Sequence, residues 1–231
     1  MIGIVDFSRF DGLDPWRVLG FFALIAFLLY RNLPGALAFA WPGWVRLRAA
    51  GGPDDVVARG PAMRDMLGQL EALGFERKGV VIERRPLARA ARDLVLASPD
   101  ARCFATVRQV RNEAWLSLVT HFSDGAAVIT ADFHWPSVDE ADYLAGGLPG
   151  NGPAELVNAH RRRVQRFVDE GRPLDARFDL EALEEAGSRF YAKGPGKREL
   201  RRKEIRGVIF AGGALIFMGS FLVQLARRLA G

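Results

Sequence analysis

The chain has 231 residues, enough for one ordinary domain together with membrane segments. Its net charge of +5 and pI near 9.9 would suit a nucleic-acid-binding protein, but the charge is unevenly placed. Residues 46–192 carry 20 Lys and Arg against 22 Asp and Glu, whereas residues 193–206 carry seven basic residues against two acidic ones. Basic residues gathered beside an apolar run argue against nucleic-acid binding and indicate a membrane surface.

The first 45 residues read as an N-terminal membrane segment. Asp14 is expected to cap a helix that begins at Pro15, and the apolar run predicts a span over about residues 15–33. Pro34 followed by glycine should end this helix. Residues 34–45 are then an interfacial stretch containing two tryptophans, and a tight two-helix hairpin is the alternative.

Glycine and proline in residues 46–60 predict a linker, and a soluble domain is expected over residues 61–192. The domain begins with an amphipathic helix from Pro61 that ends at Gly74. Five strands are predicted next, over residues 75–84, 93–97, 102–111, 114–122 and 126–134.

Two turns predict the register of the last three strands. A two-residue turn at Asp124-Gly125 would pair Leu118 with Ala131, and a turn at Asn112-Glu113 would pair Arg108 with Ser117. One face of this sheet is then apolar, as a fixed register requires.

Two more helices complete the domain, over residues 153–170 and from the capping residue Asp179 to Phe190, and both are expected on the apolar face. The predicted fold is α+β: an antiparallel β-meander of about five strands packed by helices, flanked by N- and C-terminal transmembrane helices.

The C-terminal part combines a basic juxtamembrane segment, residues 193–206, with an uncharged span, residues 207–226, in one predicted helix. Seven basic residues are candidates for binding anionic lipid headgroups: Lys193, Lys197, Arg198, Arg201, Arg202, Lys203 and Arg206. Because these residues and Arg46 and Arg48 lie between the spans, we expect a multi-pass protein of the cell (inner) membrane with a cytoplasmic domain.

The same register places Arg108, Ser117 and Asp132 in one row of the second face, with His134 in the next row. Ser, His and Asp together could support nucleophilic catalysis. However, no nucleophile elbow or oxyanion donor accompanies Ser117, and a stabilising pair between Arg108 and Asp132 is the simpler interpretation.

No metal or cofactor is expected. Cys103 is the only cysteine, and the three histidines lack the spacing of a metal site. We expect His160, on the apolar stripe of its helix, to be a hydrogen-bonded core residue.

The leading hypothesis is therefore a non-catalytic membrane protein whose domain serves binding, assembly or regulation of a membrane complex. Its partners would be the lipid bilayer and other membrane-protein subunits or further copies of itself. The alternatives are a membrane-bound hydrolase or transferase that uses the polar sheet face, and a sensor of anionic lipid.

Overall fold

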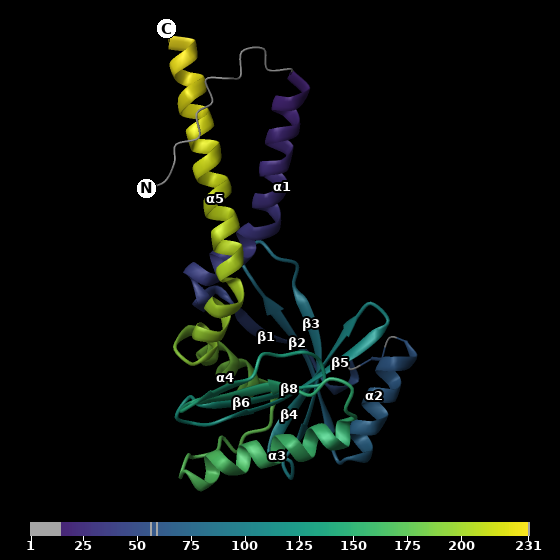
Figure 1. Cartoon of the computed structure of the whole chain (residues 1–231). Coiled ribbons are helices and arrows are strands. Elements are labelled where there is room, and N and C mark those ends of the chain that lie inside the picture. Colours follow the sequence, from purple (N-terminus) through teal and green to yellow (C-terminus); the bar gives the residue numbers. More distant parts are fainter. Residues whose placement is uncertain (1–14, 56, 59, 231) are drawn as a thin grey trace.

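The computed structural model describes residues 15–55, 57–58 and 60–230 (Figure 1). The expected cap at Asp14 and the rest of residues 1–14 lie outside this range. The described residues form an α+β fold with a mixed eight-stranded sheet and five α-helices.

The sheet has the strand order β1-β2-β3-β4-β5-β6-β8-β7. Strands β2 to β6 form the expected antiparallel meander, while β8 pairs parallel with β6. The count of about five was too low, because three further strands lie at the edges. Their bounds complete the set: β1 (Arg46–Gly51), β2 (Glu76–Arg84), β3 (Ala91–Ser98), β4 (Cys103–Val110), β5 (Glu113–His121), β6 (Ala127–Ala131), β7 (Val138–Glu140) and β8 (Tyr143–Gly147).

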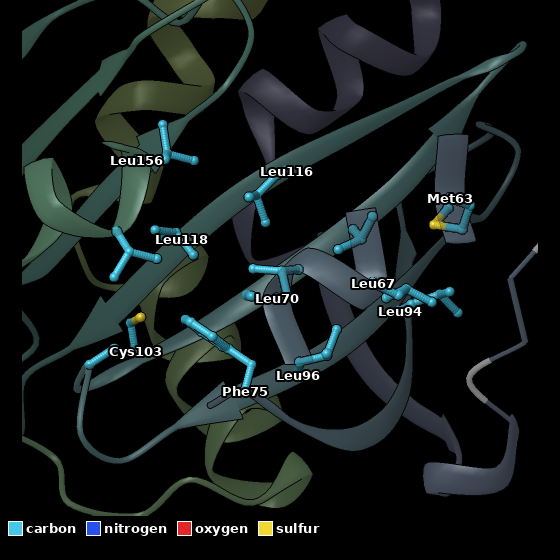
Figure 2. Packing of buried hydrophobic residues seen from close by; sticks show 14 of the residues in the cluster. Met63, Leu67, Leu70, Phe75, Leu94, Leu96, Cys103, Leu116, Leu118 and Leu156 are labelled. Atoms are coloured by element: carbon cyan, nitrogen blue, oxygen red, sulfur yellow. The ribbon is translucent and has the colours of Figure 1, made fainter. Parts of the chain in front are cut away.

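Helices cover both faces of the sheet. Helices α2 (Pro61–Ala72) and α3 (Pro153–Asp169) pack on the first face, where Figure 2 shows Leu67 and Leu70 of α2 among strand residues such as Leu96 and Leu116. Helix α4 (Leu180–Ala192) lies instead on the second face, where Leu183 packs with residues of β2, β3 and β4. The expectation that both later helices cover one face was therefore wrong.

The β4–β5 hairpin is shifted from the predicted register. Its turn is Arg111-Asn112, and Arg108 faces Trp115 rather than Ser117. The pairing has moved by two residues, and side chains alternate with a period of two, so each residue keeps its predicted face.

The β5–β6 hairpin differs by one residue, which has a larger effect. Phe122 and Ala126 bracket a three-residue loop whose last member, Gly125, has a φ of 92°. Leu118 therefore pairs with Thr130, and Val119 with Ile129. A slip of one residue moves every side chain of β6 to the opposite face.

Two long helices extend away from the sheet: α1 (Pro15–Ala40) and α5 (Gly196–Ala230) (Figure 1). Their segments Leu19–Ala40 and Gly196–Gln224 are long and apolar enough to cross a membrane, by length and composition. Phe21 lies 5.5 Å, between ring centroids, from Phe217, so the two helices pack together near their distal ends.

Helix α1 does not end at Pro34 as expected but continues through it to Ala40. A 3-10 turn, Pro42–Trp44, then leads directly into β1, in the stretch predicted to be a linker. The two tryptophans expected in the interfacial stretch, Trp41 and Trp44, stack with ring centroids 5.0 Å apart and are both half exposed. Thus α1 is connected to the sheet by only a short turn.

Candidate functional site

A cavity of about 250 Å³ lies between the second face of the sheet, α4 and the first turns of α5. Strands β4, β5 and β6 form its floor through Thr106, Arg108, Ser117, Val119 and Ile129. Aromatic side chains line its sides, namely Trp115, Phe133, Trp135, Phe190 and Tyr191. Leu47 of β1 and Glu199, Leu200 and Lys203 of α5 complete the wall.

The charged wall of the cavity is a continuous series of ion pairs. The Nε and Nη2 atoms of Arg108 donate to the two carboxylate oxygens of Asp93 over 2.5 and 2.7 Å, and Nη2 also donates to Glu83 over 3.2 Å. Glu83 accepts from Arg85 over 2.6 Å, and Arg85 in turn donates to Glu204 of α5 over 3.1 Å. These five residues, which we call the charge network, join the middle of the sheet to α5.

Burial and pairing act on the network in opposite directions. Burial alone would raise the pKa of Glu83, but the charges and hydrogen bonds of Arg85 and Arg108 outweigh it and lower that pKa. The hydrogen bonds that Arg108 donates to Asp93 raise the pKa of Arg108 above its usual value. Both side chains are therefore held in their charged forms.

The start of α5, which we call the stem (residues 196–206), is attached to the β7–β8 edge by further pairs. Arg198 pairs with Glu140 and Asp142, and Arg202 donates to Glu140 over 2.8 Å. These contacts hold the stem against the sheet.

A second group of stem contacts closes the cavity. Glu199 is 4% exposed, and its carboxylate lies 3.1 Å from the ammonium of Lys203. The same ammonium lies 3.3 Å from the ring centroid of Trp135, a cation–π contact. Any movement of the stem would therefore change the shape of the cavity.

The structure brings only part of the predicted polar face together. Arg108 and Ser117 line the cavity, but Asp132 and His134 do not. Because β6 is shifted by one residue, Asp132 belongs to the first face, where its Oδ1 accepts from Leu116 N over 2.9 Å. The predicted Arg108–Asp132 pair is wrong, since Arg108 pairs with Asp93 and Glu83 instead.

Among the described residues, neither His121 nor His134 lies within reach of the Ser117 hydroxyl as a base. His134 is exposed and is not among the residues that line the cavity, while His121, which does line the wall, lies four residues from Ser117 on the same strand. That spacing corresponds to about 13 Å along a strand. Burial lowers the pKa of His121 to about 4, so its imidazole is neutral at pH 7.

The seven predicted lipid-binding residues are divided by the structure. Three of them, Arg198, Arg202 and Lys203, take part in the stem contacts described above. Arg201 donates to the carbonyl of Phe39 over 3.4 Å and lies over its ring. Within the described residues, Lys193, Lys197 and Arg206 form no ion pair, which leaves them available to another partner.

His160 is a core residue, as expected. It is fully buried and bridges two threonines, with Nε2 2.9 Å from Thr120 Oγ1 and Nδ1 3.0 Å from Thr130 Oγ1. The Thr120 hydroxyl donates to the carbonyl of Arg102, so it must accept from Nε2–H, and Nδ1 must accept from Thr130. Burial lowers the pKa of His160 to about 3, so this neutral tautomer is retained at pH 7.

The described residues contain no group of three or more His, Cys, Asp or Glu side chains that could hold a metal ion. Burial raises the pKa of Cys103 to about 12, so its thiol is neutral at pH 7 and a poor nucleophile.

Comparisons with protein-family models, curated proteins and solved structures give no match for this chain. Arguments about function therefore rest on the geometry of the cavity and its surroundings.

Sequence reasoning missed Glu83, Asp93, Arg85 and Glu204 as members of the site. One signal was present, because Asp93 stands at the start of an apolar strand, Asp93-Leu-Val-Leu-Ala. Charged residues in such strands are rarely buried unless they are paired, so a partner on a neighbouring strand was to be sought.

Proposed function

We propose that the chain is an integral membrane protein with two spans and that its α+β domain is a non-catalytic binding and regulatory module of a membrane complex. The observation that carries the proposal is the composition of the cavity wall. It includes Leu47, close after α1, and Glu199, Leu200 and Lys203, within α5 itself. A molecule bound in the cavity would thus contact both segments that lead into the apolar helices.

The regulatory part of the proposal follows from this connection. A ligand can shift a conformational equilibrium only by the difference between its affinities for the two states. Glu199 and Lys203 belong to the same helix as the apolar segment. A ligand that binds more tightly to one position of the stem therefore also favours one orientation of α5 relative to the sheet. The charge network gives a second connection, from Asp93 to Glu204.

The cavity lining indicates the class of ligand. Its aromatic side chains favour an apolar or planar group, while its charged side chains already lie in ion pairs. Two polar groups of the wall have no hydrogen-bond partner among the described residues, the carboxylate of Glu199 and Nε1 of Trp135. A strongly charged ligand would have to break the ion pairs, whereas an uncharged molecule would not. The Ser117 hydroxyl on the floor can bind one polar group, whereas the Thr106 hydroxyl already donates to the carbonyl of Ser117 over 3.2 Å. We propose a small, mainly apolar, uncharged ligand.

Native mass spectrometry of the full-length protein, extracted from membranes in mild detergent, tests the proposal. Ser117→Phe fills the cavity floor, and Ser137→Phe makes the same change at an exposed position outside the cavity. We expect a small-molecule adduct on the wild type and on Ser137→Phe that is absent from Ser117→Phe. A wild type that carries no adduct and has no stable protein partner would contradict the proposal.

The hydrolase or transferase alternative needs the side chains of Arg108, Ser117, Asp132 and His134 to converge. Their placement on opposite faces gives that alternative no supporting geometry. The anionic-lipid alternative keeps one supporting observation, the three unpaired cations Lys193, Lys197 and Arg206. These residues are compatible with the regulatory module and do not require a separate function.

A further inference from the structure

The loop between β2 and β3 presents an apolar residue among arginines. Leu87 is 71% exposed, and its φ of 54° lies in the left-handed region that a leucine rarely adopts. A free surface loop would favour glycine or asparagine at such a position. A strained backbone at an exposed leucine makes this side chain a candidate for contact with a partner outside the chain.

Contacts with α1 and α5 place this loop beside the ends of the apolar helices that are nearest to the sheet. Arg85, at the start of the loop, pairs with Glu204, and a Cβ built on Gly35 of α1 would lie 2.3 Å from the Glu204 carboxylate. Gly35 lies inside the apolar segment of α1, and Glu204 lies near the end of the stem, three residues before the uncharged run of α5 begins at Gly207. In Figure 1 the β2–β3 connection accordingly reaches the lower end of α1.

The same end of the sheet is positively charged. Arg46 of β1 lies opposite Arg84 of β2, and Arg89 follows Leu87 in the loop. All three arginines are exposed, whereas Glu83 and Asp93 are buried in the charge network and the partly exposed Glu204 is paired with Arg85. An apolar tip with exposed arginines around it matches the headgroup region of an anionic bilayer.

We infer that the β2–β3 loop is a third membrane contact, in which Leu87 enters the interfacial region of the bilayer and Arg46, Arg84 and Arg89 face phospholipid phosphates. This inference rests on the membrane placement proposed above. It adds a contact that would hold the sheet at a fixed height and orientation beneath the two helices.

Site-directed fluorescence of the full-length protein in phosphatidylcholine vesicles tests the inference. An environment-sensitive fluorophore is attached at Ala88→Cys, which keeps Leu87, and at two references. Gln165→Cys on the exposed side of α3 reports water, and Phe210→Cys on the exposed side of α5 reports lipid. Cys103 is buried, and the protein without an added cysteine gives the labelling background.

We expect the Ala88 probe to be blue-shifted and quenched about threefold more than the Gln165 probe by a nitroxide carried near the lipid headgroups. Leu87→Ser should reduce the quenching. Adding phosphatidylglycerol to the vesicles should increase it, and the triple variant Arg46→Gln, Arg84→Gln, Arg89→Gln should abolish that increase. Since Leu87 and the arginines are exposed, these changes should not affect folding.

Other outcomes separate the inference from the proposal beneath it. An Ala88 probe that resembles Gln165, while Phe210 reports lipid, would overturn the third contact and leave the two spans in place. A Phe210 probe that also reports water would overturn both. A blue shift without quenching would show that the loop contacts protein rather than lipid, which also overturns the inference.

Discussion

Arg85, directly after β2, donates from Nη1 to the Oε1 atom of Glu204 over 3.1 Å, and this bond joins the sheet to the helix that carries the C-terminal apolar segment. Both side chains are partly buried, at 35% and 24% exposure. The pair is the last link of the charge network, so a change at Arg108 can reach α5 through Glu83, Arg85 and Glu204.

Arg108→Met should lower the free energy of unfolding more than the loss of a surface arginine does. The variant removes the bidentate partner of the buried Asp93 and one of the partners of the buried Glu83. Leaving these carboxylates buried should cost about 2–3 kcal/mol of stability. The matched control is Arg166→Met, because Arg166 also pairs with two carboxylates but lies on the surface, where the cost should stay below about 1 kcal/mol. Equal losses in chemical unfolding would show that the network contributes no more than surface pairs.

Gly187→Ala should loosen the contact between α4 and β1. A Cβ at this position would lie 2.4 Å from Leu47 Cδ1, so either the helix or the strand must move, at a cost of about 1–3 kcal/mol. Gly68→Ala, in the interior of α2, meets nothing within 4 Å and should instead stabilise by about 0.5–1 kcal/mol. Thermal unfolding of both variants measures the contrast, and a stabilised Gly187→Ala would contradict the packing described.

Acidification should destabilise the protein through His160. Its pKa is about 3 in the folded state and about 6.5 in the unfolded chain, so between these values the unfolded state binds one more proton. Stability is therefore lost as the pH falls below about 6.5. His160→Gln keeps one donor and one acceptor between Thr120 and Thr130 but does not titrate.

Urea unfolding at pH 7 and pH 5 measures this effect. The loss between these pH values should be about 2 kcal/mol smaller for His160→Gln than for the wild type. Because the pKa of His121 is also lowered, to about 4, the variant should keep part of the acid sensitivity. An unchanged pH dependence would show that His160 titrates normally in the folded protein.

Asp132 and His134 were both predicted as candidate catalytic residues, but replacing them with alanine should have different effects on stability. Asp132→Ala removes the acceptor for Leu116 N and should cost about 1–2 kcal/mol of stability. His134→Ala, at an exposed position, should change stability by less than about 0.5 kcal/mol. Loss of a measurable ester hydrolysis in the folded His134→Ala variant would restore the hydrolase alternative.

The five central strands and the helices could be predicted because their signals are local. Apolar periodicity and turn residues identified α2, α3 and the meander, and the predicted cap of α4 is present, with Asp179 Oδ1 accepting from Ala182 N over 2.7 Å. The edge strands were missed for physical reasons. β1 has few apolar residues, β7 has three residues, and the parallel pairing of β8 with β6 depends on contacts distant in sequence.

The site could be predicted only in part, because a shift of one residue in the pairing of β5 with β6 changes which side chains face the cavity. Asp124-Gly125 fits a two-residue turn and also the end of a three-residue loop, and the choice decides which face β6 presents. The partner of Arg108 could not be found in this way, because Asp93 lies on β3 and its pairing is set by the β3–β4 loop. Arg102, which has a φ of 54°, ends that loop.

The orientation of the domain stays a prediction from its flanking charges. Protease added to sealed right-side-out spheroplasts should leave the domain intact, since the basic residues between the apolar helices predict a cytoplasmic domain. Digestion of the domain while the membrane stays sealed would reverse the assigned orientation.

Membrane fractionation of cells that express the full-length protein tests the central claim most directly, namely that α1 and α5 cross a bilayer and hold the cavity at its surface. The protein should remain in the pellet through an alkaline carbonate wash and be released only by detergent. A well-dispersed monomer in the detergent-free supernatant would contradict the claim.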